Sequence, residues 1–160
     1  HERIVYETLK KSLESSTIEV QHLLVPLQVE FSSRDRDLLL KHTEHLRKAG
    51  VEVEFFGGNT FLIRAVPVLL AEVDWQAVLS DFIAECGESA GHTFDFFDKT
   101  FVIMACHGAV RGGAQMTDEE MQHLVDNLFQ SELPTHCPHG RPVFKQITYH
   151  ELDRMFKRVV

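Results

Sequence analysis

The amino-acid sequence predicts an α+β fold in which an α/β segment is inserted between helices. One observation is a hairpin pattern, because stretches rich in apolar residues at 51–56 and 60–66 flank a Gly-Gly-Asn turn. A second is that apolar residues recur at helical spacing both before and after this hairpin. The resulting order of a helix, a β-α-β-β segment and further helices is typical of an α+β domain with a middle insertion.

Three elements are expected before the hairpin. Helical spacing of apolar residues predicts helices at 1–16 and 33–49, the second of which stops at Gly50. Apolar residues among polar neighbours predict a strand at 23–31. Because Pro26 cannot donate a backbone hydrogen bond, this strand is expected at a sheet edge or with an irregular start.

Helices dominate the chain after the hairpin. Thr117 with Glu120, and Thr148 with Glu151, have the spacing of capping boxes, which satisfy backbone amides at a helix start. The expected elements are a helix capped by Asp74, a loop at 87–92, a helix at 94–106, a helix from Thr117 through Phe129, a strand at 143–147 and a helix ending in Phe156-Lys157-Arg158.

The composition excludes several classes of protein. The 160 residues are 44% hydrophobic and 25% charged, no apolar run is long enough to cross a bilayer, and no signal peptide is visible. Three cysteines without a secretory signal argue against a disulfide framework and favour reduced thiols in a cytoplasm. The net charge of −8 disfavours tight autonomous binding to DNA, so a nucleic-acid substrate would require recruitment by a partner.

Cys137 and His139 lie in the segment Cys-Pro-His-Gly-Arg-Pro, the most informative stretch of the chain. Its prolines and glycine favour a fixed loop that offers a thiolate and an imidazole to a metal ion. Two donors cannot fill a four-coordinate zinc site, so further ligands must come from elsewhere. Cys106 is the natural third ligand, the alternative being a buried structural cysteine. Cys86, among apolar residues, is assigned to the core.

Glu2 and Glu7 lie at the start of the first predicted helix. Five residues apart, they point in different directions and need not share one metal ion. A solvated acidic helix start would also explain both. Among the histidines only His139 is interpreted as a ligand, whereas others, including His42 and His45, are expected on polar helix faces or in loops.

Four short motifs follow one another along the chain. They are Glu2 with Glu7, Ala-Cys-His at 105–107, Cys-Pro-His-Gly-Arg-Pro at 137–142, and Phe-Lys-Arg at 156–158. Together they resemble the C-terminal endonuclease domain of bacterial MutL mismatch-repair proteins. That family has Asp-Gln-His-Ala, two variable residues, Glu, four variable residues and Glu, then Ala-Cys-Arg and the last two motifs in full. Here the Asp-Gln-His-Ala residues would precede the chain, and a histidine replaces the arginine of the second motif.

The resemblance implies a mixed two-metal site. The implied metal ligands are Glu2, Cys106, Cys137 and His139, completed by the upstream Asp and His. Zinc would be a structural or regulatory ion, and manganese or magnesium would activate water and stabilise the leaving oxygen of a phosphodiester. The implied catalytic residues are Glu2, Glu7 and Arg158, and the implied phosphate contacts are Arg141 and Lys157. Packing around the loop is the other interpretation of the arginines, and Lys157 can also be a solvated cation at a helix end.

A second resemblance concerns Gln-His-Leu-Leu-Val-Pro at 21–26, which is similar to the sliding-clamp-binding motif of bacterial MutL proteins. The implied clamp-binding residues are Gln21, Leu23, Leu24 and Pro26. An extended edge segment with aliphatic anchors can dock into a hydrophobic pocket of a partner. The alternative is an edge strand that packs both leucines into its own core.

The resemblance also implies the organisation and function of a longer protein. Residues 1–18 and 105–160 would form a dimerisation and endonuclease subdomain, its N-terminal strands missing from this chain, and 19–104 an inserted regulatory subdomain. The implied protein is a cytoplasmic, nucleoid-associated bacterial homodimer that nicks duplex DNA and works with a MutS-type mismatch sensor and the sliding clamp. It would bind ATP through a separate N-terminal domain. The alternative is a non-catalytic dimerisation and clamp-binding module with a structural zinc. Because the chain begins at His1 rather than Met, it is interpreted as a fragment or a processed chain, which need not be active by itself.

Overall fold

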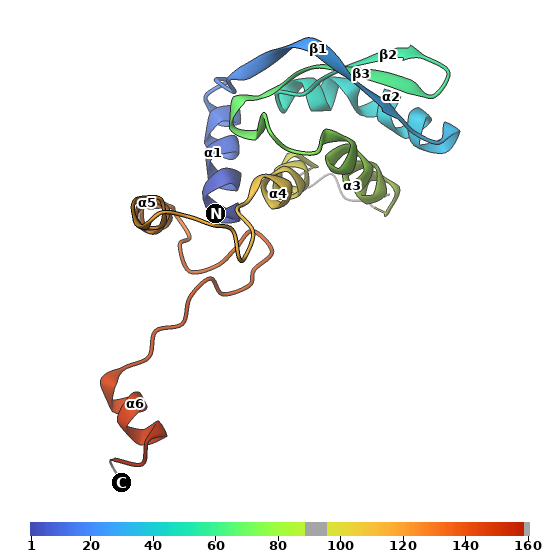
Figure 1. The fold of residues 1–160 in the computed structure, drawn as a ribbon. Helices are drawn as coiled ribbons and strands as arrows, with labels where there is room; N and C mark the ends of the chain where they lie inside the picture. Colours follow the sequence, from blue (N-terminus) through green and yellow to red (C-terminus); the bar gives the residue numbers. More distant parts are fainter. Residues whose placement is uncertain (89–95, 159–160) are drawn as a thin grey trace.

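A three-stranded antiparallel sheet lies along one side of the structure, at the top of Figure 1, and helices pack against one of its faces. The structure is a computed structural model that describes residues 1–88 and 96–158. Its elements are α1 (Glu2–Glu14), β1 (Val20–Glu30), α2 (Ser33–Lys48), β2 (Glu52–Gly57), β3 (Thr60–Pro67), the 3₁₀ helix η1 (Val68–Leu70), α3 (Trp75–Glu88), α4 (Phe96–Gly108), α5 (Asp118–Gln130) and α6 (Tyr149–Met155). This arrangement confirms the predicted α+β class.

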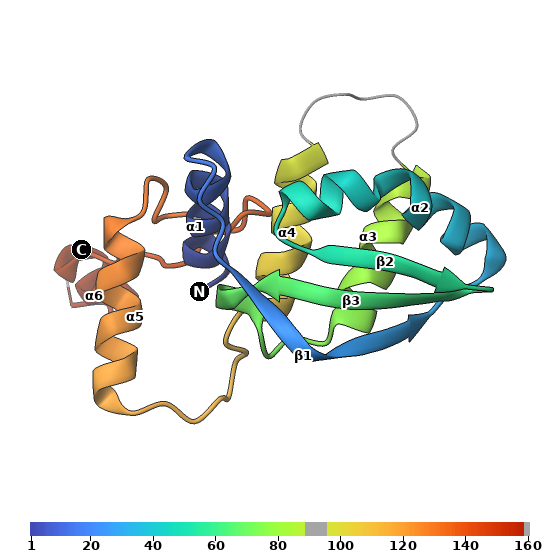
Figure 2. The ribbon, with the colours of Figure 1, turned by 90° about the horizontal axis from the view of Figure 1, so that it is seen from above.

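The strands lie in the order β1-β3-β2, so β1 is an edge strand, as Pro26 predicts. Figure 2 shows the sheet from above, with the hairpin of β2 and β3 beside β1. The pairing of β1 with β3 shifts register between His22, opposite Ala65, and Leu27, opposite Ile63. Four β1 residues therefore face a single β3 residue, and the strand bulges away from the ladder around Pro26.

The core lies between the sheet and the helices. Phe61, Ile63 and Ala65 alternate along β3 and are fully buried, as expected for a sheet with one covered face. They belong to one cluster that also includes buried residues of α1, α2, α3 and α4. The predicted boundary at 104/105 falls inside α4, which packs on both α1 and α3. The division into two subdomains therefore stays a prediction.

Several element boundaries differ from those predicted. No strand forms at 143–147 in the described structure, because the only pairing nearby is a single bridge between His136 and Pro142. Gly87, expected in a loop, belongs to α3, and 89–92 lie outside the described residues. The helix predicted at 94–106 is described from Phe96 and continues to Gly108, since 94–95 are also outside. Asp74 caps α3 through a hydrogen bond from the Ala77 amide, and both capping boxes are present as predicted.

Two histidines of α2 pack in an aromatic cluster, which corrects the expectation of a polar helix face. The His45 ring lies 3.9 Å from the Phe97 ring and 4.2 Å from the Phe96 ring, measured between centroids. His42 stacks on the same Phe96 at 4.8 Å. Thr100 Oγ1 donates to a carbonyl oxygen and therefore accepts from His45 Nε2 at 3.0 Å, which defines the neutral tautomer of His45.

We expect the free energy of unfolding to fall as the pH is lowered from 6.5 towards 4. Burial, and next the neighbouring His42, lower the pKa of His45 from 6.5 to about 4, so the unfolded chain binds a proton that the folded chain excludes. The full change corresponds to about 3 kcal/mol, and we expect about 1 kcal/mol because the half-exposed ring is screened by solvent. Urea unfolding at pH 7 and pH 5 should show a smaller difference in His45→Leu, whereas an unchanged difference would contradict this assignment.

Candidate metal centre

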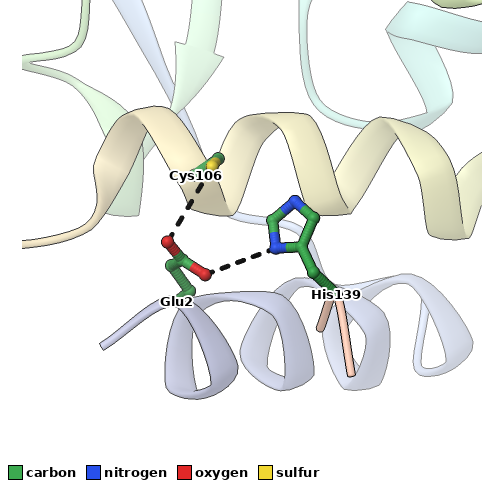
Figure 3. Close-up of side chains that lie close together, drawn as sticks. All are labelled: Glu2, Cys106 and His139. Atoms are coloured by element: carbon green, nitrogen blue, oxygen red, sulfur yellow. Dashed lines mark hydrogen bonds and ion pairs between the residues drawn. The ribbon is translucent and has the colours of Figure 1, made fainter. Parts of the chain in front are cut away.

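Three of the predicted ligands meet where α1, α4 and the loop after α5 converge (Figure 3). One ligand atom each of Glu2, Cys106 and His139 lies within 4.8 Å of the other two. Cys106 Sγ is 3.8 Å from Glu2 Oε1, and His139 Nδ1 is 3.5 Å from Glu2 Oε2. The structure thus brings Glu2 together with two residues that are more than 100 positions further along the sequence.

The spacings from the two Glu2 oxygens are close to those between ligand atoms around a zinc ion. With zinc–ligand distances of 2.0–2.3 Å, oxygen, nitrogen and sulfur donors around a tetrahedral ion lie about 3.4 to 3.6 Å apart. The two distances from Glu2, 3.5 and 3.8 Å, are close to this range. A thiolate and an imidazole favour zinc, and a carboxylate oxygen can complete its coordination or bind a second, harder cation.

Helix packing places Glu2 opposite Cys106. Glu2 is in the first turn of α1 and Cys106 is in the last turn of α4, and these two helices pack along their lengths. Val5 of α1 and Phe101 and Met104 of α4 belong to the same core cluster, and each is no more than 1% exposed. Because the apolar residues recur at helical spacing, the amphipathic pattern that forms the core also fixes the two ends that carry the ligands.

A tight turn places His139 against α1. The Cys137 amide donates to the Arg141 carbonyl at 2.8 Å, and the Gly140 amide donates to the Cys137 carbonyl at 2.9 Å. Gly140 has φ +80°, a left-handed conformation that glycine adopts without a Cβ clash. The fourth predicted ligand is adjacent, with Cys137 Sγ 4.0 Å from His139 Nδ1. Cys137 therefore lies at the edge of the three-residue cluster.

The neighbours of Cys106 oppose its ionisation when no cation is bound. Burial, and next the carboxylate of Glu2, raise the pKa of the Cys106 thiol. A divalent cation between the two groups would neutralise both negative charges and favour the thiolate. Cys86 lies in α3 against the core, where burial raises the pKa of its thiol to about 11. The assignment of Cys86 to the core is confirmed.

The other residues predicted for catalysis or phosphate binding are not members of the cluster. Glu7 is buried, and its carboxylate accepts hydrogen bonds from the backbone of residues 132–133. Glu2 and Glu7 therefore point in different directions, as predicted. Arg141 is exposed on the ligand loop, the turn of residues 137–141 that carries Cys137 and His139. Lys157 and Arg158 follow α6, which Figure 1 shows at the end of an extended segment far from α1.

Sequence reasoning did not identify two residues beside the site. Arg3 is 8% exposed and forms an ion pair with Glu7 at 3.8 Å. An arginine four residues before a glutamate on a helix is a sequence pattern that indicates such an ion pair. His107, next to Cys106, lies with Nε2 2.8 Å from Asp81 Oδ2 and so links α4 to α3. His107 stands where the family motif has an arginine, and this difference is the sequence feature that could have drawn attention to it.

The segment predicted to bind the sliding clamp forms the bulge of β1. Leu23 is half-buried against the core, whereas Leu24 is 100% exposed and the adjacent Val25 is 76% exposed. Gln21 is also exposed, and Pro26 is half-buried. The alternative in which both leucines pack into the core is therefore wrong for Leu24.

Comparison with known proteins identifies the family of this chain. Residues 1–116 match the family model described as the MutL C-terminal dimerisation domain. The chain is 38% identical over 161 residues to the DNA mismatch repair protein MutL of Geotalea daltonii and 36% identical over 162 residues to that of Geobacter sulfurreducens. The MutL protein of Bartonella bacilliformis is 36% identical over 160 residues. Each alignment covers 99% of this chain and 26–27% of the relative.

The fold and the ligand cluster define the class as an α+β domain with a candidate zinc centre between two helices and a loop. The chain belongs to the MutL C-terminal dimerisation domain family. It is therefore a domain of DNA mismatch repair proteins, and this membership supports a homodimer. The chain spans about a quarter of the length of the curated relatives it matches. Among the described residues, no helix is both long and apolar enough to cross a membrane.

Proposed function

We propose that the protein containing this chain is a metal-dependent endonuclease that nicks duplex DNA during mismatch repair. The observation that carries the proposal is the convergence of Glu2, Cys106 and His139 in a chain of this family. A carboxylate, a thiol and an imidazole within 4.8 Å of one another are a donor set that suits a divalent cation such as zinc. Cys137 and an Asp and His from the preceding segment would complete the site.

Within this proposal the chain holds ions and positions them near a phosphodiester. A bound divalent cation would supply a hydroxide nucleophile and neutralise charge on the leaving oxygen. Glu2 has one oxygen towards Cys106 and the other towards His139, so its carboxylate can bridge two ions. Arg141, exposed on the ligand loop, is available for bidentate contact with phosphate.

A structural zinc module is the second candidate. If Glu2, Cys106, Cys137 and His139 all bind one zinc ion, that ion has four protein ligands and no open position for a substrate. Cys137 Sγ is 4.0 Å from His139 Nδ1, and in this arrangement it would have to move closer to Glu2 and Cys106 to act as the fourth ligand. Nicking of circular DNA by the full-length protein with manganese distinguishes the two, because only the endonuclease proposal expects relaxed product.

Recruitment by other proteins fits the charge of the chain. The net charge of −8 opposes strong autonomous binding to DNA. We propose that the exposed bulge of β1 binds the sliding clamp and that a MutS-type sensor and an ATP-binding N-terminal domain of the same protein control access to DNA. The proposed location is the bacterial cytoplasm, at the nucleoid.

We further propose that α5 contributes to the homodimer interface. Met121, Val125 and Phe129 recur every four residues and form one apolar stripe, with exposed fractions of 46%, 46% and 60%. No residue of α5 is buried within this chain, although apolar stripes of helices are normally covered. A second copy is the occupant that membership in a dimerisation family favours.

We expect Val125→Glu to convert a dimer of this domain to monomers, because it places a charge in the centre of the apolar stripe. The monomer itself should unfold at nearly the wild-type denaturant concentration, since Val125 is 46% exposed. Sedimentation velocity measures the association. His123→Glu adds the same charge to an exposed site two residues away on α5 and should leave the dimer intact. A dimeric Val125→Glu would contradict the proposal.

A further inference from the structure

A buried ion pair on α1 holds the segment that carries the metal-binding loop. Arg3 and Glu7 are 8% and 7% exposed, and they lie one turn apart on the helix that starts with Glu2. Burial of a charge is costly unless the charge is paired and hydrogen-bonded. The groups that bind these two side chains therefore indicate the structural role of the ion pair.

Arg3 binds the loop directly. Its Nε donates to the His136 carbonyl at 2.7 Å, and one terminal nitrogen donates to the Cys137 carbonyl at 2.8 Å. The planar guanidinium thereby fixes two successive peptide groups. The second of these belongs to a predicted ligand, and only Pro138, with its restricted φ, separates it from His139.

Glu7 binds the other end of the same segment. Its two carboxylate oxygens accept hydrogen bonds from the Glu132 amide at 2.8 Å and the Leu133 amide at 3.2 Å. A third contact, with Arg3 at 3.8 Å, joins the two anchors. The connection from α5 to the ligand loop is thus attached to α1 at both of its ends.

We infer that Arg3 and Glu7 are positioning residues that place Cys137 and His139 against Glu2 and so organise the metal site. The inference rests on the proposed metal site and gives Glu7 a role other than catalysis. A role in stabilising the hydrophobic core does not explain the contacts of Arg3 and Glu7. Within the described residues, the hydrogen bonds of both side chains go to residues 132–137 and none goes to the sheet or to α2, α3 or α4.

Zinc affinity of the full-length protein tests the inference, measured with zinc alone in competition with a chromophoric chelator. Arg3→Gln and Glu7→Gln should each weaken zinc binding about 10-fold or more, as is typical when an outer-shell partner of a metal ligand is removed. The double variant Arg3→Met/Glu7→Leu leaves no unpaired buried charge, so it remains folded and should show the same loss. Circular dichroism checks the fold of each variant.

Lys11→Gln is the matched control. Lys11 also lies on α1 and forms an ion pair with Glu132 of the same segment at 3.2 Å, but both side chains are exposed. Exposed pairs contribute little, so zinc affinity should not change. If zinc affinity falls equally in this variant, the loss is not specific to the buried pair and the inference is overturned.

A second protein, which lacks the two loop ligands, separates an effect on ligand position from an effect on the stability of the fold. In Cys137→Ser/His139→Ala, the loop no longer offers ligands, so adding Arg3→Met/Glu7→Leu should not weaken zinc binding further. Cobalt substitution adds a spectroscopic check, because the pair variant should lose the part of the thiolate charge-transfer absorption that Cys137→Ser also removes. A folded pair variant with wild-type zinc affinity, or an equal additional loss in both backgrounds, would overturn the inference. A wild-type protein that binds no zinc would instead overturn the proposed metal site and, with it, this inference.

Discussion

His139→Ala is expected to abolish nicking of circular DNA by the full-length protein with manganese. His139 contributes the only imidazole of the cluster, with Nδ1 3.5 Å from Glu2 Oε2. Its loss removes one of the three donors that the cluster brings together. Since outer-shell changes already lower metal affinity about 10- to 100-fold, loss of a direct ligand should lower zinc affinity further.

His123→Ala is the control for this experiment. His123 is an exposed histidine of α5, so its replacement removes the same chemical group without touching the cluster. Nicking and zinc content should stay at the wild-type level. Full nicking by His139→Ala would contradict the ligand assignment, and zinc loss in a protein whose wild type never nicks would favour the structural zinc module.

Local sequence patterns predicted the elements whose cause is local. Both capping boxes, the Asp74 cap and the β2–β3 hairpin depend on residues within a few positions of one another, and all four are present. The strand predicted at 143–147 depends on a partner strand, and a local apolar pattern cannot supply one. The environment of His45 also depends on distant residues. The sequence places it on a polar helix face, whereas phenylalanines of α3 and α4 surround it in the structure.

The sequence predicts which residues belong to the candidate site better than it predicts how they are arranged. Glu2, Cys106 and His139 were proposed as ligands from motif order, and the structure brings them together. The role of Glu7 could not be seen in the same way, because its partners are backbone amides at residues 132–133. Backbone groups carry no sequence signature, so a motif glutamate that anchors a loop resembles one that binds a metal ion.

Leu24→Asp is expected to abolish binding to the sliding clamp without destabilising the domain. The Leu24 side chain is 100% exposed, so its burial contributes nothing to folding and the free energy of unfolding should change by no more than about 0.5 kcal/mol. If Leu24 enters a hydrophobic pocket of the clamp, a carboxylate there would be buried without a partner. That cost, added to the lost apolar contact, should weaken binding by at least about 100-fold, since about 2 kcal/mol or more is typical of an anchor residue. Surface plasmon resonance against immobilised clamp measures it.

The control compares two exposed leucines at different sites. Leu69 in η1 is 48% exposed and lies outside the β1 bulge, so Leu69→Asp adds the same charge and should leave clamp affinity unchanged. Leu23→Ala is expected to differ from both, because Leu23 packs against the core and its loss lowers stability. Wild-type clamp affinity in Leu24→Asp would remove the β1 bulge as the docking segment. Equal losses in Leu24→Asp and Leu69→Asp would indicate that charge, not the aliphatic anchor, governs the interaction.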